Sequence, residues 1–324
     1  MITGGTSGIG SELARELSIR GAQLVLLTQH PLSDPFLVEY VEELRASTSN
    51  ELITAEQGEI QTTEDGVEVN WALNYLANFH LLSILSPAIR AQPPDRDVRV
   101  LFGSCISYLG GELPVQAQEL SKEGKDPKSK KAQSTTAAPQ PTSNFVPSAA
   151  YATSKLALAT FAHAFQKHLS SYQRPDKFPP NAHVILVDPG FTRTPGMRRY
   201  LSWGSLYGLF FYLIMYPFWW LVLKSPEQGA QSFLYAAMEA TYGKGEGGWL
   251  IRECREAKIA RPEIRDEAVQ KALWEYSEKM VQEAEKRGAQ TRAKAKKEAE
   301  EKAQAKPKQE AQKQSGSRRS RKVT

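Results

Sequence analysis

Thr3-Gly4-Gly5-Thr6-Ser7-Gly8-Ile9-Gly10 is a glycine-rich turn that leads directly into a helix. The following segment, Ser11 to Leu17, carries its apolar residues at helical spacing. Glycines let the backbone approach a pyrophosphate closely, and the start of a helix offers free N–H groups and a partial positive charge. Gln23 to Thr28 is typical of a buried parallel strand. Together the turn, helix and strand predict a dinucleotide-binding α/β sheet.

A second pattern, Tyr151-Ala152-Thr153-Ser154-Lys155, lies near the middle of the chain. A spacing of four residues places the Tyr151 phenol beside the Lys155 ammonium on one face of a helix. A free tyrosine has a pKa of about 10, and a nearby cation favours the phenolate. The lysine would therefore make the tyrosine a general acid and base at neutral pH. The spacing alone is also common on solvated helices, so the pattern gains meaning from its neighbours.

Further features occur in a fixed order around this pair. An apolar helix is expected at Asn74 to Phe79, a strand ending in a serine at Val98 to Ser104, and a strand at Val184 to Val187 that leads into Pro189-Gly190. With the glycine turn and the Tyr-Lys pair, this order resembles the short-chain dehydrogenase/reductase superfamily over roughly residues 1 to 260. The resemblance implies a doubly wound Rossmann-type parallel sheet.

Within that superfamily the chain is most similar to the retinol-dehydrogenase-like branch. The similarity rests on Thr63-Glu64-Asp65-Gly66, on Ser225-Pro226-Glu227-Gln228-Gly229-Ala230-Gln231, and on Leu273-Trp274-Glu275-Tyr276-Ser277.

The resemblance implies roles for individual residues. Tyr151 would exchange a proton with the substrate oxygen, and Lys155 would lower the pKa of Tyr151 and hold the nicotinamide ribose. Ser104 would hydrogen-bond the substrate oxygen, and Asn74 would hold a water relay behind Lys155. No metal is expected. The expected cofactor-binding residues are Thr3, Gly4, Gly5, Thr6, Ser7, Gly8, Ile9, Gly10, Thr28, Gln29, Tyr151, Lys155, Pro189, Gly190, Thr192 and Thr194.

Some of these assignments have alternatives. The less favoured alternative for Asn74 is that it only bonds the backbone within its own helix. The segment Gly103-Ser104-Cys105-Ile106-Ser107 allows a register in which Cys105 stands where the catalytic serine belongs, with Ser107 as a substitute donor. A thiol is a weaker hydrogen-bond donor than a hydroxyl, so Ser104 is the preferred assignment.

The choice between NAD and NADP depends on the residues after the second expected strand. Thr28 stands where an acidic residue would hold the ribose 2′-hydroxyl of NAD, and Gln29 stands where NADP-binding relatives often have arginine. Without an acid there is no repulsion against a 2′-phosphate, and His30 or Arg20 is close enough in sequence to approach one. The sequence therefore favours NADP weakly over NAD, and with it the reductive direction.

Two parts of the family pattern are missing. Met1-Ile2 leaves almost nothing of the strand that should precede the glycine turn, and no Asn-Asn-Ala-Gly tetrapeptide occurs in the chain. A strand-helix-strand unit needs about 30 residues, so the stretch from Gln57 to Asp65 is too short for a crossover helix and a strand. We therefore expect a Rossmann-type sheet that lacks most of its first strand and one helix-strand unit. Either the gene model is incomplete or the protein is degenerate.

Composition predicts one domain with appendages. The chain has 324 residues, 41% of them hydrophobic, and only two cysteines. We expect a Rossmann domain over residues 1–260 with a disordered insertion at about 118–143, a C-terminal helix at 261–280, and a charged tail at 281–324. The cysteine content and the absence of a signal peptide before the glycine turn predict a cytosol-facing protein.

Ser205 to Leu223 is a run of 19 residues without a charge, rich in Trp and Tyr. This composition favours a membrane-associated segment, kinked at Pro217, that dips into or lies on the bilayer of the endoplasmic reticulum or the surface of a lipid droplet. The alternative is an apolar lid over the substrate. Either interpretation predicts a lipophilic substrate of retinoid, sterol, isoprenoid or long-chain type.

The net positive charge of the chain is confined to the tail. Residues 281–324 contain 14 Lys and Arg against 6 Glu and no Asp, a net charge of +8, whereas the whole chain carries +5. A solvated tail is the first interpretation and contact with anionic lipid the second. No nucleic-acid partner is expected, because aromatic residues are not interleaved with the basic ones. The sequence does not predict an oligomeric state.

The sequence thus predicts an NAD(P)-dependent oxidoreductase that interconverts a lipophilic alcohol and its ketone or aldehyde. The alternative is a non-catalytic, membrane-associated scaffold that retains the shape of a reductase.

Overall fold

The computed structural model describes residues 1–28, 31–50, 52–57, 67–68, 70–114, 147–202, 205–290 and 293. The chain divides into two compact units, Met1–Glu275 and Tyr276–Thr324. In the second unit the described residues 276–290 are helical. The expected insertion at 118–143 and most of the expected tail lie outside the described residues. All that follows concerns the first unit.

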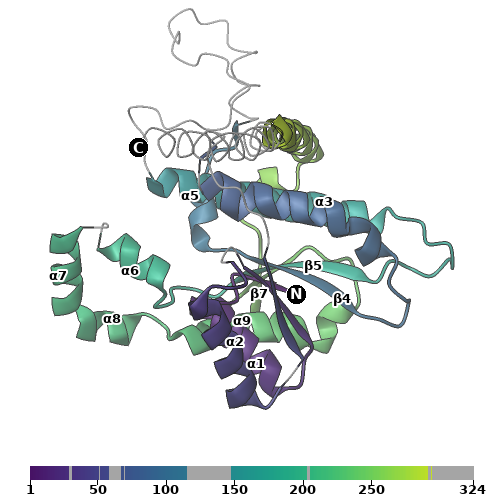
Figure 1. Ribbon diagram of the computed structural model, residues 1–324. Helices are drawn as coiled ribbons and strands as arrows, with labels where there is room; N and C mark the ends of the chain where they lie inside the picture. The colour runs from purple at the N-terminus through teal and green to yellow at the C-terminus, as the bar shows by residue number, and fades with distance from the viewer. Residues whose placement is uncertain are drawn as a thin grey trace, which may run out of the picture. The chain divides into compact units, whose positions relative to one another are not determined.

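The described strands form two mainly parallel sheets (Figure 1). The first sheet has the order β1-β2-β3, with β1 at Ile2–Thr3, β2 at Leu24–Thr28 and β3 at Ile53–Gln57. The second has the order β4-β5-β6-β7, with β4 at Val98–Gly103, β5 at Ala182–Asp188, β6 at Trp249–Arg252 and the antiparallel β7 at Arg255–Ala257. The α/β architecture with parallel strands is the one that the sequence predicts.

The separation into two sheets differs from the single sheet that we expected. Strand β1 has two residues, and both β1 and β4 are edge strands because no described strand lies between them. The chain between β3 and the next helical segment, which begins at Trp71, is too short for a crossover helix and a strand. Residues 58–66, where the missing unit was expected, lie outside the described part of the chain.

Helices α1, at Gly8–Ile19, and α2, at Pro35–Thr48, cover the first sheet. Helix α2 begins at Asp34, whose carboxylate accepts a hydrogen bond from the backbone N–H of Phe36. The core of this layer is made of residues with little or no exposure, namely Ala14, Leu24, Leu26, Leu37, Val41 and Leu44. The Tyr40 hydroxyl donates to the Gly5 carbonyl at 2.8 Å, so α2 also supports the glycine turn.

Helices η1, α3 and α5 pack on one another, and α5 packs on β5 of the second sheet. Their bounds are Trp71–Leu76 for the π-helical η1, Ala77–Arg90 for α3 and Pro147–Ser170 for α5. Phe161 of α5 is the centre of an aromatic cluster that joins these elements to β4 and to the helix that begins at residue 267. The ring centroids of Tyr75, Phe79, Phe102, Phe165 and Trp274 all lie 5.2–6.1 Å from that of Phe161.

Helix α9, at Pro226–Met238, connects the two sheets, because it packs on α1 of the first layer and on β4, β5 and β6 of the second. Gly229 allows the close approach: a Cβ atom there would lie 2.9 Å from Thr192 Oγ1 and 3.2 Å from Ile9 Cδ1. The helix begins with a capping box between Ser225 and Gln228. The 3₁₀ segments η2, η3 and η4 lie at Ile106–Gly110, Ala240–Gly243 and Pro262–Ile264.

The uncharged run is divided between two short helices, α7 at Leu206–Ile214 and α8 at Tyr216–Val222, preceded by α6 at Pro195–Leu201. The break falls at Met215, just before the expected kink at Pro217. These helices extend away from the strands at the left of Figure 1. None of the helices in the described part of the chain combines the length and apolar character needed to cross a bilayer.

Candidate active site

Tyr151 and Cys105 meet where β4 ends and α5 begins its first turns. The Cys105 Sγ atom lies 3.6 Å from the Tyr151 hydroxyl oxygen and 2.7 Å from the Ser107 Oγ atom. Burial is the main factor that raises the pKa of Tyr151, and Cys105 adds to the effect. The segment after β4 therefore presents a thiol, backed by a serine hydroxyl, to the tyrosine.

Lys155 lies one helical turn after Tyr151. Its Nζ atom donates to the Gly103 carbonyl at 2.9 Å and lies 5.6 Å from the centroid of the Tyr151 ring. Burial lowers the pKa of Lys155, because the ammonium loses its water. The sequence predicts that Lys155 lowers the pKa of Tyr151; in this structure burial dominates and the pKa of Tyr151 is raised instead.

Ser104 is placed differently from the preferred assignment. Ser104 is 6% exposed, and its hydroxyl has no hydrogen-bond partner among the described residues. Its backbone N–H donates to the Val187 carbonyl, which fixes Ser104 as the continuation of β4. Of the neighbours Ser104 and Cys105, it is Cys105 that faces the Tyr151 hydroxyl, as in the alternative register.

Asn74 lies in the π-helical turn η1, a type of irregularity that is frequent at functional sites. Its side-chain amide donates to Ser154 Oγ at 3.1 Å, and Ser154 donates to the Tyr151 carbonyl at 2.8 Å. Its own backbone carbonyl accepts a hydrogen bond from Asn78 at 2.9 Å. Asn74 therefore contacts α5, the helix that carries Tyr151 and Lys155, through Ser154.

The glycine turn is shaped to admit a phosphate. Gly4 and Gly8 have φ values of +66° and +57°, which favour glycine, and a Cβ atom on Gly10 would collide with the Gly4 carbonyl. The Ser7 side chain makes no capping hydrogen bond, and the first turn of α1 holds no acidic residue. The first N–H groups of the helix are thus available to an anion, so these residues fit a dinucleotide pyrophosphate.

The segment from Pro189 to Thr194 lies next to this turn. Gly190 has a φ of +76° and its N–H donates to the buried Asp188 carboxylate at 3.0 Å. A Cβ atom on Gly8 would lie 3.5 Å from the Thr194 side chain, which itself caps α6. The structure thus brings together two expected cofactor-binding segments that lie about 180 residues apart in the sequence.

The two residues expected to select the cofactor are only partly described. Thr28 is the buried last residue of β2, and Gln29 lies outside the described residues, as does His30.

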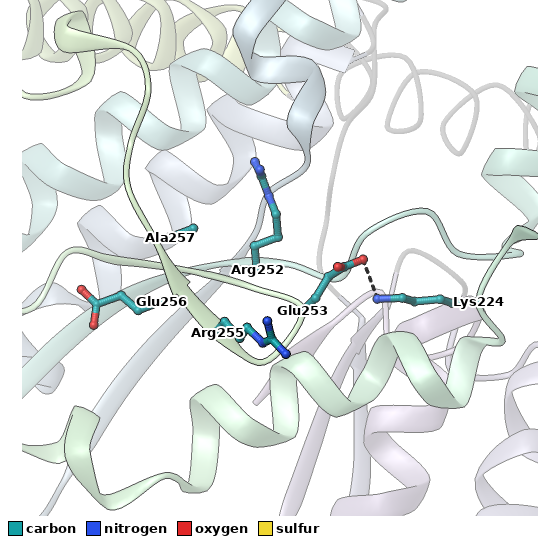
Figure 2. Close-up of a pocket in the computed structure, with 6 residues that line it drawn as sticks. All are labelled: Lys224, Arg252, Glu253, Arg255, Glu256 and Ala257. Atoms are coloured by element: carbon teal, nitrogen blue, oxygen red, sulfur yellow. Dashed lines mark hydrogen bonds and ion pairs between the residues drawn. The ribbon is translucent and has the colours of Figure 1, made fainter.

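A polar pocket of about 520 Å³ lies beside the Pro189–Thr194 segment (Figure 2). Its lining residues are Lys224, Arg252, Glu253, Arg255, Glu256 and Ala257. Lys224 Nζ pairs with Glu253 Oε1 at 2.6 Å, and Arg252 pairs with Asp188 at 3.0 Å. Sequence reasoning missed this pocket, because the charges of residues 252–257 form no recognised motif and their partners Lys224 and Asp188 lie elsewhere in the chain.

Comparisons with known proteins extend these observations. No family model matches the chain. Uncharacterized oxidoreductase pbr1 of Schizosaccharomyces pombe is 34% identical and covers 92% of this chain and 85% of its own. That alignment spans 336 residues, more than the 324 residues of this chain, so the relative holds residues that have no counterpart here.

More distant relatives have named activities. Retinol dehydrogenase 13 of Mus musculus is 26% identical over 87% of this chain and 83% of its own. Polyprenol dehydrogenase of the same species is 34% identical, but over 65% of this chain and 53% of its own. Among solved structures, the L-sorbose reductase of Gluconobacter frateurii, complexed with NADPH and L-sorbose, has a TM-score of 0.50 at 17% identity and covers 78% of this chain and 92% of its own.

Proposed function

Because this chain belongs to the short-chain dehydrogenase/reductase family, we propose that it is an NAD(P)-dependent oxidoreductase that interconverts a lipophilic alcohol and its ketone or aldehyde. The relatives reported above confirm the family that the sequence predicts, including its similarity to retinol dehydrogenases. The finer assignments of substrate, cofactor and residues are part of the proposal.

The proposal rests on the contact between Tyr151 and Cys105 beside Lys155, at the end of β4. When bound, the nicotinamide cofactor supplies or accepts the hydride. Tyr151 gives its hydroxyl proton to the carbonyl oxygen in reduction and takes it back in oxidation. Cys105 and Ser107 stand where a donor to the substrate oxygen is needed, which extends the expected set of Tyr151, Lys155, Ser104 and Asn74.

Lys155 and Asn74 position the tyrosine. Lys155 holds the end of β4 against α5 through the Gly103 carbonyl, and an ammonium has further N–H donors for a ribose hydroxyl. Asn74 supports the same helix turn through Ser154. The glycine turn and Thr194 approach each other, and in this proposal they would hold the pyrophosphate and the carboxamide respectively. NADP remains the preferred cofactor and NAD the alternative.

Two observations support a lipophilic substrate taken from a membrane or lipid-droplet surface. The relatives named above include dehydrogenases of retinol and of polyprenol. Helices α7 and α8 expose large apolar side chains, and their segment begins next to the cofactor-binding residue Thr194. A cytosol-facing position at the endoplasmic reticulum or at a lipid droplet follows from this proposal.

The test is hydride transfer by the purified full chain. NADPH carrying deuterium at its transferable position should deliver the label to a retinoid or isoprenoid aldehyde presented in vesicles. A labelled alcohol product, absent with the Tyr151→Phe variant, supports the proposal. NADPH binding without any label transfer to either class of aldehyde contradicts it.

A non-catalytic scaffold is the second candidate, and the division of the sheet favours it. A two-residue β1 and the open edge of β4 leave the glycine turn with less support than a continuous sheet would provide. The same observation fits an incomplete gene model, because the relative from Schizosaccharomyces pombe contains additional residues. A scaffold would bind vesicles yet show no NADPH binding, and a version of the chain with the missing unit restored would then distinguish degeneration from an incomplete sequence.

A further inference from the structure

Helices α7 and α8 present an apolar surface that no described residue covers. Leu206, Tyr207 and Leu221 are 84%, 90% and 78% exposed, and most of the other large side chains of these helices are also exposed. Contiguous apolar surface of this kind marks an interaction site rather than an ordinary protein surface. The charged residues near this surface indicate which partner binds to it.

The charged residues of the segment that forms this apolar surface are all basic. From Arg193 to Lys224 the chain contains Arg193, Arg198, Arg199 and Lys224 but no Asp or Glu. The Arg193 guanidinium lies 5.6 Å from the centroid of the Trp220 ring, so a cation and an indole stand together at the border of the apolar surface. Aromatic and basic side chains bordering apolar helices suit the headgroup layer of an anionic bilayer.

The segment from Arg193 to Lys224, here called the excursion, has its two ends hydrogen-bonded to each other beside the Pro189–Thr194 segment. Arg193 N–H donates to the Lys224 carbonyl at 2.9 Å, and Lys224 N–H donates to the Phe191 carbonyl at 3.0 Å. The segment containing α6, α7 and α8 thus leaves and rejoins the domain at one place, which we call the base of the excursion.

The base is held against Gly190 by a side chain from the β6–β7 turn. Glu253 pairs with Lys224, and a Cβ atom added to Gly190 would collide with the Glu253 carboxylate. Glu253 and Cys254 both have left-handed backbones, with φ values of 51° and 61°. Positive φ values at both positions are what the two-residue turn between β6 and β7 requires, and this turn holds the Glu253 carboxylate beside Lys224.

We propose that helices α6 to α8 dock on an anionic bilayer, and that docking is coupled to cofactor binding through the Lys224–Glu253 pair at the base of the excursion. The inference rests on the proposed function, because it makes the cofactor site more competent at the membrane than in solution. Docking fixes the orientation of the base, and the base fixes Gly190 and Thr194 against the glycine turn. Coupling between two binding events is reciprocal.

The experiment measures both directions of this coupling with the full chain. NADPH affinity is measured in solution and in the presence of vesicles of phosphatidylcholine with phosphatidylserine, and vesicle binding is measured with and without NADPH. We expect vesicles to tighten NADPH binding at least about fivefold, and NADPH to tighten vesicle binding by the same factor. Vesicles of phosphatidylcholine alone should bind more weakly, because the basic residues then have no counter-charge.

Variants separate docking from coupling. Leu206→Glu with Leu221→Glu should weaken vesicle binding at least about tenfold and leave NADPH affinity in solution unchanged. The matched control, Ile84→Glu with Phe178→Glu, changes exposed apolar residues outside the excursion and should bind vesicles like the parent. Glu253→Gln should still bind vesicles, whereas the mutual tightening should fall toward onefold.

Each result that contradicts the proposal points to a different part of it. Vesicle binding that leaves NADPH affinity unchanged overturns the coupling and leaves the proposed function standing. Equal vesicle binding by the Leu206/Leu221 variant and its control overturns the docking surface. If the parent chain forms stable dimers that the Leu206/Leu221 variant dissociates, and the parent does not bind vesicles, the surface belongs to a second copy of the chain instead. Absence of NADPH binding in every condition overturns the proposed function as well.

Discussion

The Cys105 Sγ atom lies 3.6 Å from the Tyr151 hydroxyl oxygen, while the hydroxyl of the preceding residue, Ser104, is buried without a partner. The atom that faces the expected general acid is therefore a sulfur. A thiol donates a weaker hydrogen bond than a hydroxyl. In the proposed reaction, Cys105 would accordingly stabilise an oxyanion beside Tyr151 less well than a serine at the same place.

Cys105→Ser should raise the turnover of lipophilic carbonyls. A gain of one neutral hydrogen bond contributes about 1 kcal/mol, so we expect an increase of about fivefold in kcat. Steady-state kinetics with NADPH measures the change. Ser104→Ala is the matched control, and its kcat should stay within about twofold of the parent. Loss of activity in Ser104→Ala, with no gain in Cys105→Ser, would return the donor role to Ser104.

Tyr151→Phe should reduce kcat by about 10²- to 10⁴-fold, because the phenyl ring has no hydroxyl proton to give to the carbonyl oxygen. The phenyl ring keeps the packing, so NADPH affinity and Tm should hardly change. Single-turnover measurements with saturating cofactor check the chemical step directly. A variant that retains half of the parent rate would exclude Tyr151 as the general acid.

Gly10→Ala should weaken NADPH binding at least about tenfold. The new methyl group would collide with the Gly4 carbonyl, so the start of α1 must move away from the glycine turn. Its N–H groups would then no longer point toward the pyrophosphate. Gly110→Ala is the control, since a Cβ atom there meets no atom within 4 Å. Cofactor titration of both variants distinguishes a local effect from a loss of folding, which thermal unfolding reports separately.

Phe161→Ala should lower the free energy of unfolding by about 3–5 kcal/mol, because it empties the centre of the aromatic cluster around α5. The exposed Phe178 provides the comparison: Phe178→Ala should change stability by no more than about 0.5 kcal/mol. Urea unfolding followed by circular dichroism measures both. Similar effects of the two substitutions would contradict the assignment of Phe161 to the core.

Stability should decrease as the pH falls from about 6.5 toward 4. Burial, with Arg265 and Lys167 nearby, lowers the pKa of His163 from 6.5 to about 4. Below pH 6.5 the unfolded chain therefore binds a proton that the folded chain refuses, and up to about 3 kcal/mol of stability is lost by pH 4. His163→Gln should remove that part of the pH dependence. Parallel pH curves for both proteins would disprove the prediction.

Much of the fold followed from local patterns. The predicted strand at Gln23 to Thr28 corresponds to β2 at Leu24–Thr28, and the predicted strand at Val98 to Ser104 corresponds to β4 at Val98–Gly103. The pairing of strands did not follow, because it depends on which strands are present to lie between others. With no described strand between β1 and β4, the expected single sheet became two.

By itself the sequence determined which side chains share one element: Tyr151 and Lys155 on α5, the glycines at the start of α1, and the uncharged run that became α7 and α8. Helical periodicity and the conformational freedom of glycine act within a few residues, so such features are visible without a structure. Only the tertiary structure decided that Cys105 faces Tyr151, that Thr194 meets Gly8 and that Lys224 pairs with Glu253. These contacts join distant segments, and their geometry is set by how whole helices and strands pack, which no local pattern encodes.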